Sequence, residues 1–215
     1  MGQATRNIAN SFTTSGVITS SAVNNTTISG ITDLSAGGSL ILISTSTASS
    51  DATVNITSGI DSTYDEYLIL LTNIHPSANG PNHGFQATTD GSNFNVTQTT
   101  SHFRARHSED DAVTVFGYDT GNDIAQGTTY QSLGSPAYDN DCSLNGWIKL
   151  YNPSSTTYVK HWISNTVTFE AGNGGICQPV YNGGYFNTTS AITGVSFKFS
   201  AGNIDSGTYQ LFGVK

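Results

Sequence analysis

Beyond residue 38, apolar and polar positions alternate along short runs of the chain. In the stretch GWIKLY, Ile148 and Leu150 alternate with Trp147, Lys149 and Tyr151, and the stretch VSFKFS has the same period of two. This period places successive side chains on opposite faces of an extended strand. The pattern therefore predicts β-strands, each with one face turned toward a core.

Runs rich in Val, Ile, Thr and aromatic residues, bounded by Gly, Asn, Pro or Asp, extend this prediction to about a dozen strands. The predicted strands are 39–45, 52–57, 65–74, 83–89, 94–100, 112–118, 128–133, 143–151, 157–170, 178–186, 191–199 and 207–214. No twelve-residue stretch has the period of an amphipathic helix. The sequence thus predicts an all-β fold, a two-sheet antiparallel sandwich of the jelly-roll type.

Near the end of the chain, the segment SAGNIDSGT brings Gly202, Asn203, Asp205 and Gly207 together. Such residues favour a tight reversal, so we expect the last two strands to be antiparallel neighbours. The final strand then completes a sheet and ties down the C-terminus.

Residues 1–38 differ from the rest, because their aliphatic side chains are sparse, spaced by about five residues or fewer, and show no helical period. Such a segment cannot form a core, so it is either a flexible tether or an extended arm that lies along a neighbouring molecule. We favour the arm, because a solvated tether has little use for regularly placed aliphatic residues. The candidate contact residues of the arm are Val17, Ile18, Val23, Ile28 and Ile31. The expected organisation is an arm at 1–38 and a β-sandwich domain at 39–215.

Composition narrows the possible partners. Charged residues make up 10% of the chain, whereas Thr, Ser, Asn and Gly occupy 99 of its 215 positions. The net charge is −8, with only 7 Lys and Arg. Neither nucleic acid nor an anionic membrane surface is expected as a partner, because both are bound through clustered cations. The first residues lack the apolar segment of a signal peptide, so we expect the chain to be made and used without Sec export.

The search for catalytic motifs finds none of the common nucleophile, zinc, phosphate or dinucleotide patterns. We therefore expect no enzyme activity and no cofactor. A pair of carboxylates for glycoside hydrolysis stays open, because it requires only spatial proximity.

One stretch, SHFRARHSEDDA at 101–112, concentrates charge. Its residues His102, Arg104, Arg106 and His107 are candidates for contact with a glycan or a protein partner, an acidic glycan suiting the arginines. A metal site that uses both histidines and Glu109 fits no specific spacing. The alternative, which we favour, is an exposed strand and loop whose charges compensate one another.

Other polar features have ordinary explanations. Asp139, Asp141 and Ser143 alternate as calcium ligands do, but the glycine and glutamate of a calcium loop are missing. Cys142 and Cys177 are either two small apolar thiols, which we favour, or one disulfide. Candidate exposed aromatic residues, suited to sugar rings or protein interfaces, are Tyr64, Tyr118, Tyr138, Tyr181 and Tyr185.

Three stretches resemble a group of virion proteins of tailed phages, particularly marine ones. They are SGIDSTYDEYLILLTNIHPS at 58–77, YNPSSTTYVKHWI at 151–163 and YFNTTSAITGVSFKFSAGNIDSGTYQLFGVK at 185–215. The resemblance covers most of residues 39–215 and implies a non-enzymatic tail or fibre-like protein of the virion. It brings no catalytic or binding residues.

On this reading, the arm anchors the chain to other virion proteins, the sandwich is displayed outward for host attachment, and the fibre role suggests a homotrimer. The alternatives are a capsid decoration or head-fibre protein, and a module that binds host surface carbohydrate.

Overall fold

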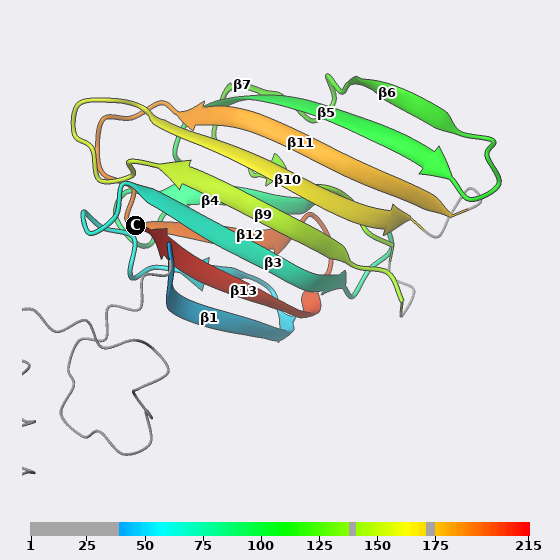
Figure 1. The fold of residues 1–215 in the computed structure, drawn as a ribbon, viewed down its shortest axis with the longest axis horizontal. Coiled ribbons are helices and arrows are strands. Elements are labelled where there is room, and N and C mark those ends of the chain that lie inside the picture. The colour runs from blue at the N-terminus through cyan, green and yellow to red at the C-terminus, as the bar shows by residue number, and fades with distance from the viewer. Residues whose placement is uncertain (1–38, 138–140, 171–174) are drawn as a thin grey trace, which may run out of the picture. The chain divides into compact units, whose positions relative to one another are not determined.

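The computed structural model describes residues 39–137, 141–170 and 175–215, which contain thirteen β-strands and no helix (Figure 1). The strands are β1 (Leu40–Asp51), β2 (Val54–Ile56), β3 (Glu66–Pro76), β4 (His83–Thr88), β5 (Gln98–Ser108), β6 (Thr114–Tyr118), β7 (Ile124–Gly127), β8 (Gln131–Ser132), β9 (Leu144–Tyr151), β10 (Lys160–Glu170), β11 (Ile176–Phe186), β12 (Gly194–Phe199) and β13 (Ile204–Val214). The all-β prediction is confirmed.

The strands form two antiparallel sheets. The larger has the order β1-β13-β3-β9-β10-β11-β5-β6, with β7 also paired to β5, and the smaller has the order β2-β12-β4-β8. Eight strands pair in a nested way, first with last: β1 with β13, β2 with β12, β3 with β9, and β4 with β8. Nested pairing between two sheets is the topology of a jelly roll, as predicted.

The remaining five strands enlarge one sheet. β5, β6 and β7 are inserted between β4 and β8, and β10 and β11 are inserted between β9 and β12. Both insertions add to the larger sheet on the far side of β9, as Figure 1 shows. We call β10, β11, β5, β6 and β7 the wing.

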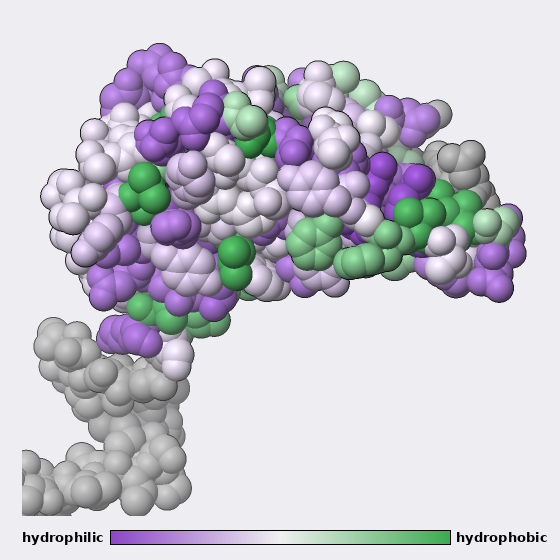
Figure 2. All heavy atoms as spheres, turned by 90° about the horizontal axis from the view of Figure 1, so that it is seen from above, coloured by the Kyte–Doolittle hydropathy of each residue, from purple (hydrophilic) through white to green (hydrophobic). Residues whose placement is uncertain are grey.

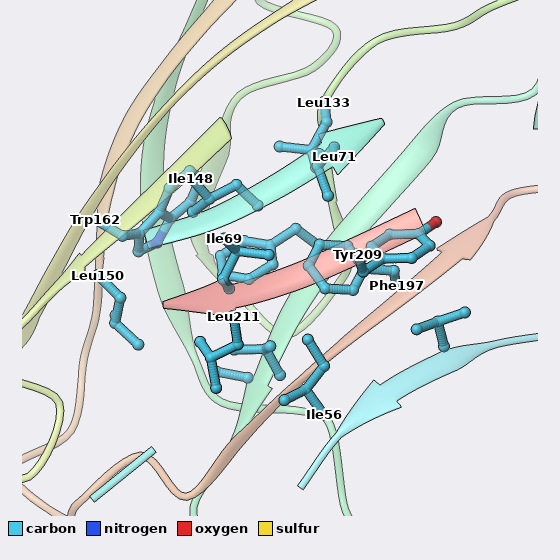
Figure 3. Close-up of a cluster of buried hydrophobic side chains, with 14 of the residues drawn as sticks. Ile56, Ile69, Leu71, Leu133, Ile148, Leu150, Trp162, Phe197, Tyr209 and Leu211 are labelled. Carbon is cyan, nitrogen blue, oxygen red and sulfur yellow. The ribbon is translucent and has the colours of Figure 1, made fainter. Parts of the chain in front are cut away.

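The apolar core lies between the two sheets of the jelly roll (Figure 3). Its side chains come from alternate positions of the strands, as the sequence predicts: Ile148 and Leu150 are fully buried, whereas Trp147, Lys149 and Tyr151 are partly exposed. At its centre, the rings of Phe197 and Tyr209 lie 4.8 Å apart. Burial of such rings supplies most of the stability of a small β-domain.

The end of the chain departs from the expected hairpin. β12 belongs to the smaller sheet and β13 to the larger, so the turn between them carries the chain from one layer to the other. Gly202 adopts a φ of 71°, which suits glycine, and Ser77 Oγ accepts the amide N–H of Asn203 at 2.8 Å. β13 lies between β1 and β3, inside the sheet, because the nested topology places the last strand beside the first.

Two further differences fall in the wing. The strand predicted at 94–100 begins at Gln98 and continues to Ser108, through the charge-dense stretch, and β7 was not predicted. The arm residues Val17, Ile18, Val23, Ile28 and Ile31 lie outside the described residues.

Candidate functional site

Strand β5 carries the four predicted contact residues, and their side chains do not share one surface. His102 is only 2% exposed and faces the smaller sheet, where its Nδ1 lies 3.4 Å from the side-chain amide of Gln131. Burial lowers the pKa of His102 below its usual 6.5. His102 is therefore a neutral interior group and does not reach a surface ligand.

The two arginines of β5 have partners within the wing. Arg104 Nη2 pairs with Asp119 Oδ2 at 3.1 Å, and its Nη1 donates to Gln178 Oε1 at 3.3 Å. Arg106 Nη2 donates to Glu170 Oε2 at 2.8 Å. These ion pairs join β5 to β10 and to the loop after β6, so both guanidinium groups act within the protein.

His107 lies on the opposite face of β5. Its Nε2 is 3.0 Å from Asp111 Oδ1, and both side chains are largely exposed. Arg104, Arg106 and His107 thus each have a carboxylate within 3.1 Å. An exposed pair of this kind contributes little to stability.

The inner face of the wing is largely polar, unlike the core of the jelly roll. Gln131 lies at the centre of its hydrogen bonds: its Oε1 accepts the hydroxyl of Thr100 at 2.5 Å, and its amide donates to Asn182 Oδ1 at 3.1 Å. Asn182 in turn donates to Ser164 Oγ at 3.1 Å. All four side chains are buried, so hydrogen bonds replace apolar contact in this part of the sandwich.

The outer face of the wing carries the aromatic residues instead. Tyr118, Phe103 and Tyr181 are direct cross-strand neighbours on β6, β5 and β11. The rings of Phe103 and Tyr181 stack with centroids 5.1 Å apart, and Phe116 meets Phe103 edge-on at 6.0 Å. Phe116 is 75% exposed and Tyr118 is 55% exposed. Four aromatic side chains thus form a row that faces solvent.

Aliphatic side chains continue this apolar surface onto β10. Ile163 and Val167 are 39% and 42% exposed. Val167 lies directly opposite Pro179 of β11, beside the row. Figure 2 shows hydrophobic side chains gathered at the end of the wing where β5 and β6 lie. We call the surface formed by Phe103, Phe116, Tyr118, Ile163, Val167 and Tyr181 the aromatic face.

Contiguous exposed apolar patches on proteins are typical of interaction sites, so this face is the candidate functional surface. Exposed Tyr and Phe rings offer a large contact area at low entropic cost, and few charges need to be desolvated.

Sequence reasoning found only part of this face. Tyr118 and Tyr181 belong to it, whereas Tyr64 packs on the core, Tyr185 lies beside His161, and Tyr138 is outside the described residues. Phe103 and Phe116 were missed. The signal was the alternation of β5, in which Phe103 and Ala105 oppose His102 and Arg104; the apolar set points outward because the interior there is polar.

The calcium and disulfide alternatives find little support. Asp139 lies outside the described residues, and Asp141 is exposed. Cys142 is buried, whereas Cys177 is an exposed free thiol on β11, so the two cysteines are not bridged. Within the described part of the chain, no helix is long and apolar enough to cross a membrane.

Comparison with known proteins adds no family assignment. The chain matches no protein-family model, and no curated protein sequence matches it. The functional argument therefore rests on the fold and its surfaces.

Proposed function

We propose that this chain is a non-enzymatic structural protein of a tailed-phage virion, associated with the tail or its fibres. The observation that carries the proposal is the aromatic face, a solvent-exposed apolar surface built on rigid strands. Its role is to pack against a neighbouring virion protein. The jelly roll is compatible with this role, since the fold recurs in viral capsid and lectin domains. Fold analogy alone assigns no function, so the face is the stronger argument.

The geometry of the face suits assembly. Phe103 and Tyr181 hold each other by stacking, and the backbone of each is fixed in a sheet that is paired on both sides. Little conformational entropy is therefore lost when a partner covers them. The arm at 1–38 provides the second attachment in this proposal, and the jelly roll is displayed outward for host attachment.

The experiment compares virions that carry wild-type chain with virions that carry the double variant Phe116→Ser, Tyr118→Ser. We expect the isolated variant to unfold within about 0.5 kcal/mol of wild type, because both side chains are exposed. Its incorporation into particles, measured by quantitative mass spectrometry, should fall severalfold.

Tyr158→Ser is the matched control, since Tyr158 is 69% exposed and lies in the loop between β9 and β10. Normal incorporation of the double variant would contradict an assembly role for the aromatic face. Absence of the wild-type chain from the particle would reject the virion role altogether. The copy number per particle separates a tail protein, with few copies, from a capsid decoration protein, with hundreds.

A further inference from the structure

A cleft of about 580 Å³ lies on the outer side of the smaller sheet, and Asp123 in its lining accepts the hydroxyl of Tyr118, a residue of the aromatic face, at 2.8 Å. One wall is formed by β4 and β12, with Asn82 just before the start of β4 and Lys198 on β12. The other wall is the segment 121–130, which includes Asn122, Asp123 and Tyr130. The volume falls within the range of small-molecule sites, roughly 300–1,000 Å³.

Buried glutamine side chains hold the second wall in place. Gln86 Nε2 donates to the carbonyl oxygens of Thr128 and Thr129 at 3.0 and 3.1 Å. Gln98 Nε2 donates to the same Thr129 oxygen at 2.9 Å, and Gln131 Nε2 donates to the carbonyl of Asn122 at 2.8 Å. All three glutamines are fully buried. The loop is thereby fixed before any ligand arrives, which lowers the entropic cost of binding.

Tyr130, at the end of the second wall, packs against the first wall. Its ring packs directly over Gly84: a Cβ added at residue 84 would lie 2.7 Å from Tyr130 Cβ, so the close approach requires glycine. Its hydroxyl donates to Ser196 Oγ at 3.1 Å, and the Lys198 ammonium lies 4.3 Å from the ring centroid. These contacts fix both the aromatic ring and the cation at the edge of the cleft.

Lys198 differs from the other cationic side chains that the strands carry. Arg104, Arg106 and Lys149 each have a carboxylate partner, and Lys160 is buried against backbone carbonyls. Within the described residues, the structure shows no ion pair for Lys198. Its ammonium group therefore retains hydrogen-bond donors for a ligand.

We propose that this cleft binds a neutral saccharide. The side chains of Asn82, Asn122, Asp123 and Lys198 offer the mixture of donors and acceptors that ring hydroxyls require. Tyr130 and Phe199 supply apolar surface for the C–H face of a sugar ring.

Charge favours a neutral ligand over an acidic one. The cleft holds one cation and one carboxylate, which cancel, and the whole chain carries a net charge of −8 that repels polyanions. The two arginines considered for an acidic glycan are paired elsewhere, as described above.

The inference concerns sugar binding by the isolated chain and does not depend on the virion role. Particle incorporation tests the proposed function, whereas titration of purified protein tests the cleft, so either can fail alone. If both hold, the cleft provides the recognition step of host attachment.

The test is a titration of the full ¹⁵N-labelled chain, followed by NMR, with glucose, galactose, mannose and N-acetylglucosamine as neutral probes and glucuronate as the acidic comparison. We expect at least one neutral sugar to shift the amide signals of 121–130 and 198–200 saturably, with a dissociation constant in the millimolar range. Glucuronate should bind more weakly than that sugar.

Lys198→Met should weaken the binding by about tenfold or more, because a charged donor is lost while the aliphatic stem remains. Lys149→Met is the matched control, since Lys149 pairs with Glu66 on the larger sheet. Asn82→Ala is a second cleft variant, which keeps the test decisive if Lys198→Met loses its fold. No shift in the cleft with any neutral probe, tighter binding of glucuronate, or shifts confined to the aromatic face would each overturn the proposal.

Discussion

The interior of the sandwich is filled in two different ways. Between the sheets of the jelly roll, the side chains are apolar, with Phe85, Trp162 and Phe197 packed ring to ring (Figure 3). Trp162 of β10 and Phe186 of β11 belong to this apolar core. Most other buried side chains beneath β10, β11 and β5 are polar and joined by hydrogen bonds.

The difference separates two tasks. The apolar region provides stability, since apolar burial is favourable without directional requirements. The polar region holds a loop, because Gln86, Gln98 and Gln131 donate to carbonyl oxygens within 122–129. Hydrogen bonds fix position more strictly than apolar contacts, so this polar interior specifies the wall of the cleft.

The largest expected effect comes from the apolar region. Phe85→Ala removes a fully buried ring, whose centroid lies 5.2 Å from that of Trp162 and 5.6 Å from that of Phe197. We expect the free energy of unfolding to fall by about 3–5 kcal/mol, from lost burial and the cavity left behind. Urea denaturation measures the change, with the exposed Tyr158→Ala as control. A loss no larger than that of the control would show that this region is not the main source of stability.

A substitution in the polar region should lower the free energy of unfolding by less, and its effect should be confined to nearby segments. Gln131→Leu keeps much of the side-chain volume but leaves Asn182 Oδ1 and the carbonyl of Asn122 without this donor. We expect the free energy of unfolding to fall by about 2–3 kcal/mol. Hydrogen exchange should accelerate at 122–131 more than in β3 or β13.

Gln210→Leu provides the matched control for that experiment, because Gln210 lies half-buried on the outer face of β13. Equal acceleration throughout the domain would mean that the polar network supports the fold in general and not the loop in particular.

The smallest effect is the response of stability to a change of pH from 7 to 5. Burial lowers the pKa of His83 to about 3, and its Nε2 lies 2.8 Å from the hydroxyl of Tyr209. Below the unfolded-state pKa of about 6.5, the unfolded chain takes up a proton that the folded chain does not. The stability contributed by neutral His83 is therefore complete above pH 6.5 and declines toward pH 3, by up to about 1.4 kcal/mol per pH unit.

His102 acts in the same direction, since burial lowers its pKa as well. Urea denaturation at pH 7, 6 and 5 should show that the free energy of unfolding declines as the pH falls. The decline per pH unit should be smaller in the variant His83→Gln. His161→Gln, an exposed histidine on β10, controls for the substitution itself. If His83→Gln left the pH dependence of the free energy of unfolding unchanged, this would contradict the claim that burial keeps His83 unprotonated in the folded chain.

The sequence predicted the jelly roll well because most of its strands obey the usual rule of apolar residues inside. Ile148, Leu150, Tyr209 and Leu211 alternate with polar or partly exposed residues, and all four are buried. The course of the chain after β12 was predicted wrongly, because turn residues indicate a reversal but not the sheet that the next strand enters.

The wing resisted prediction for a different physical reason. In β5 the polar side chains His102 and Thr100 face inward, while Phe103 faces solvent, so the usual rule selects the wrong face. Which face of such a strand turns inward depends on the buried glutamine and asparagine side chains that it packs against. These side chains come from distant segments of the chain. The ion pairs of Arg104 with Asp119 and of Arg106 with Glu170 likewise join strands that only the folded topology brings together.

A cryo-EM map of the virion that encodes this chain tests the central claim most directly. The account predicts density for the jelly roll on the tail or its fibres, with the aromatic face covered by a neighbouring protein and the cleft beside Lys198 open to solvent. Density in which the aromatic face is solvated, or a particle that lacks the chain, would contradict it.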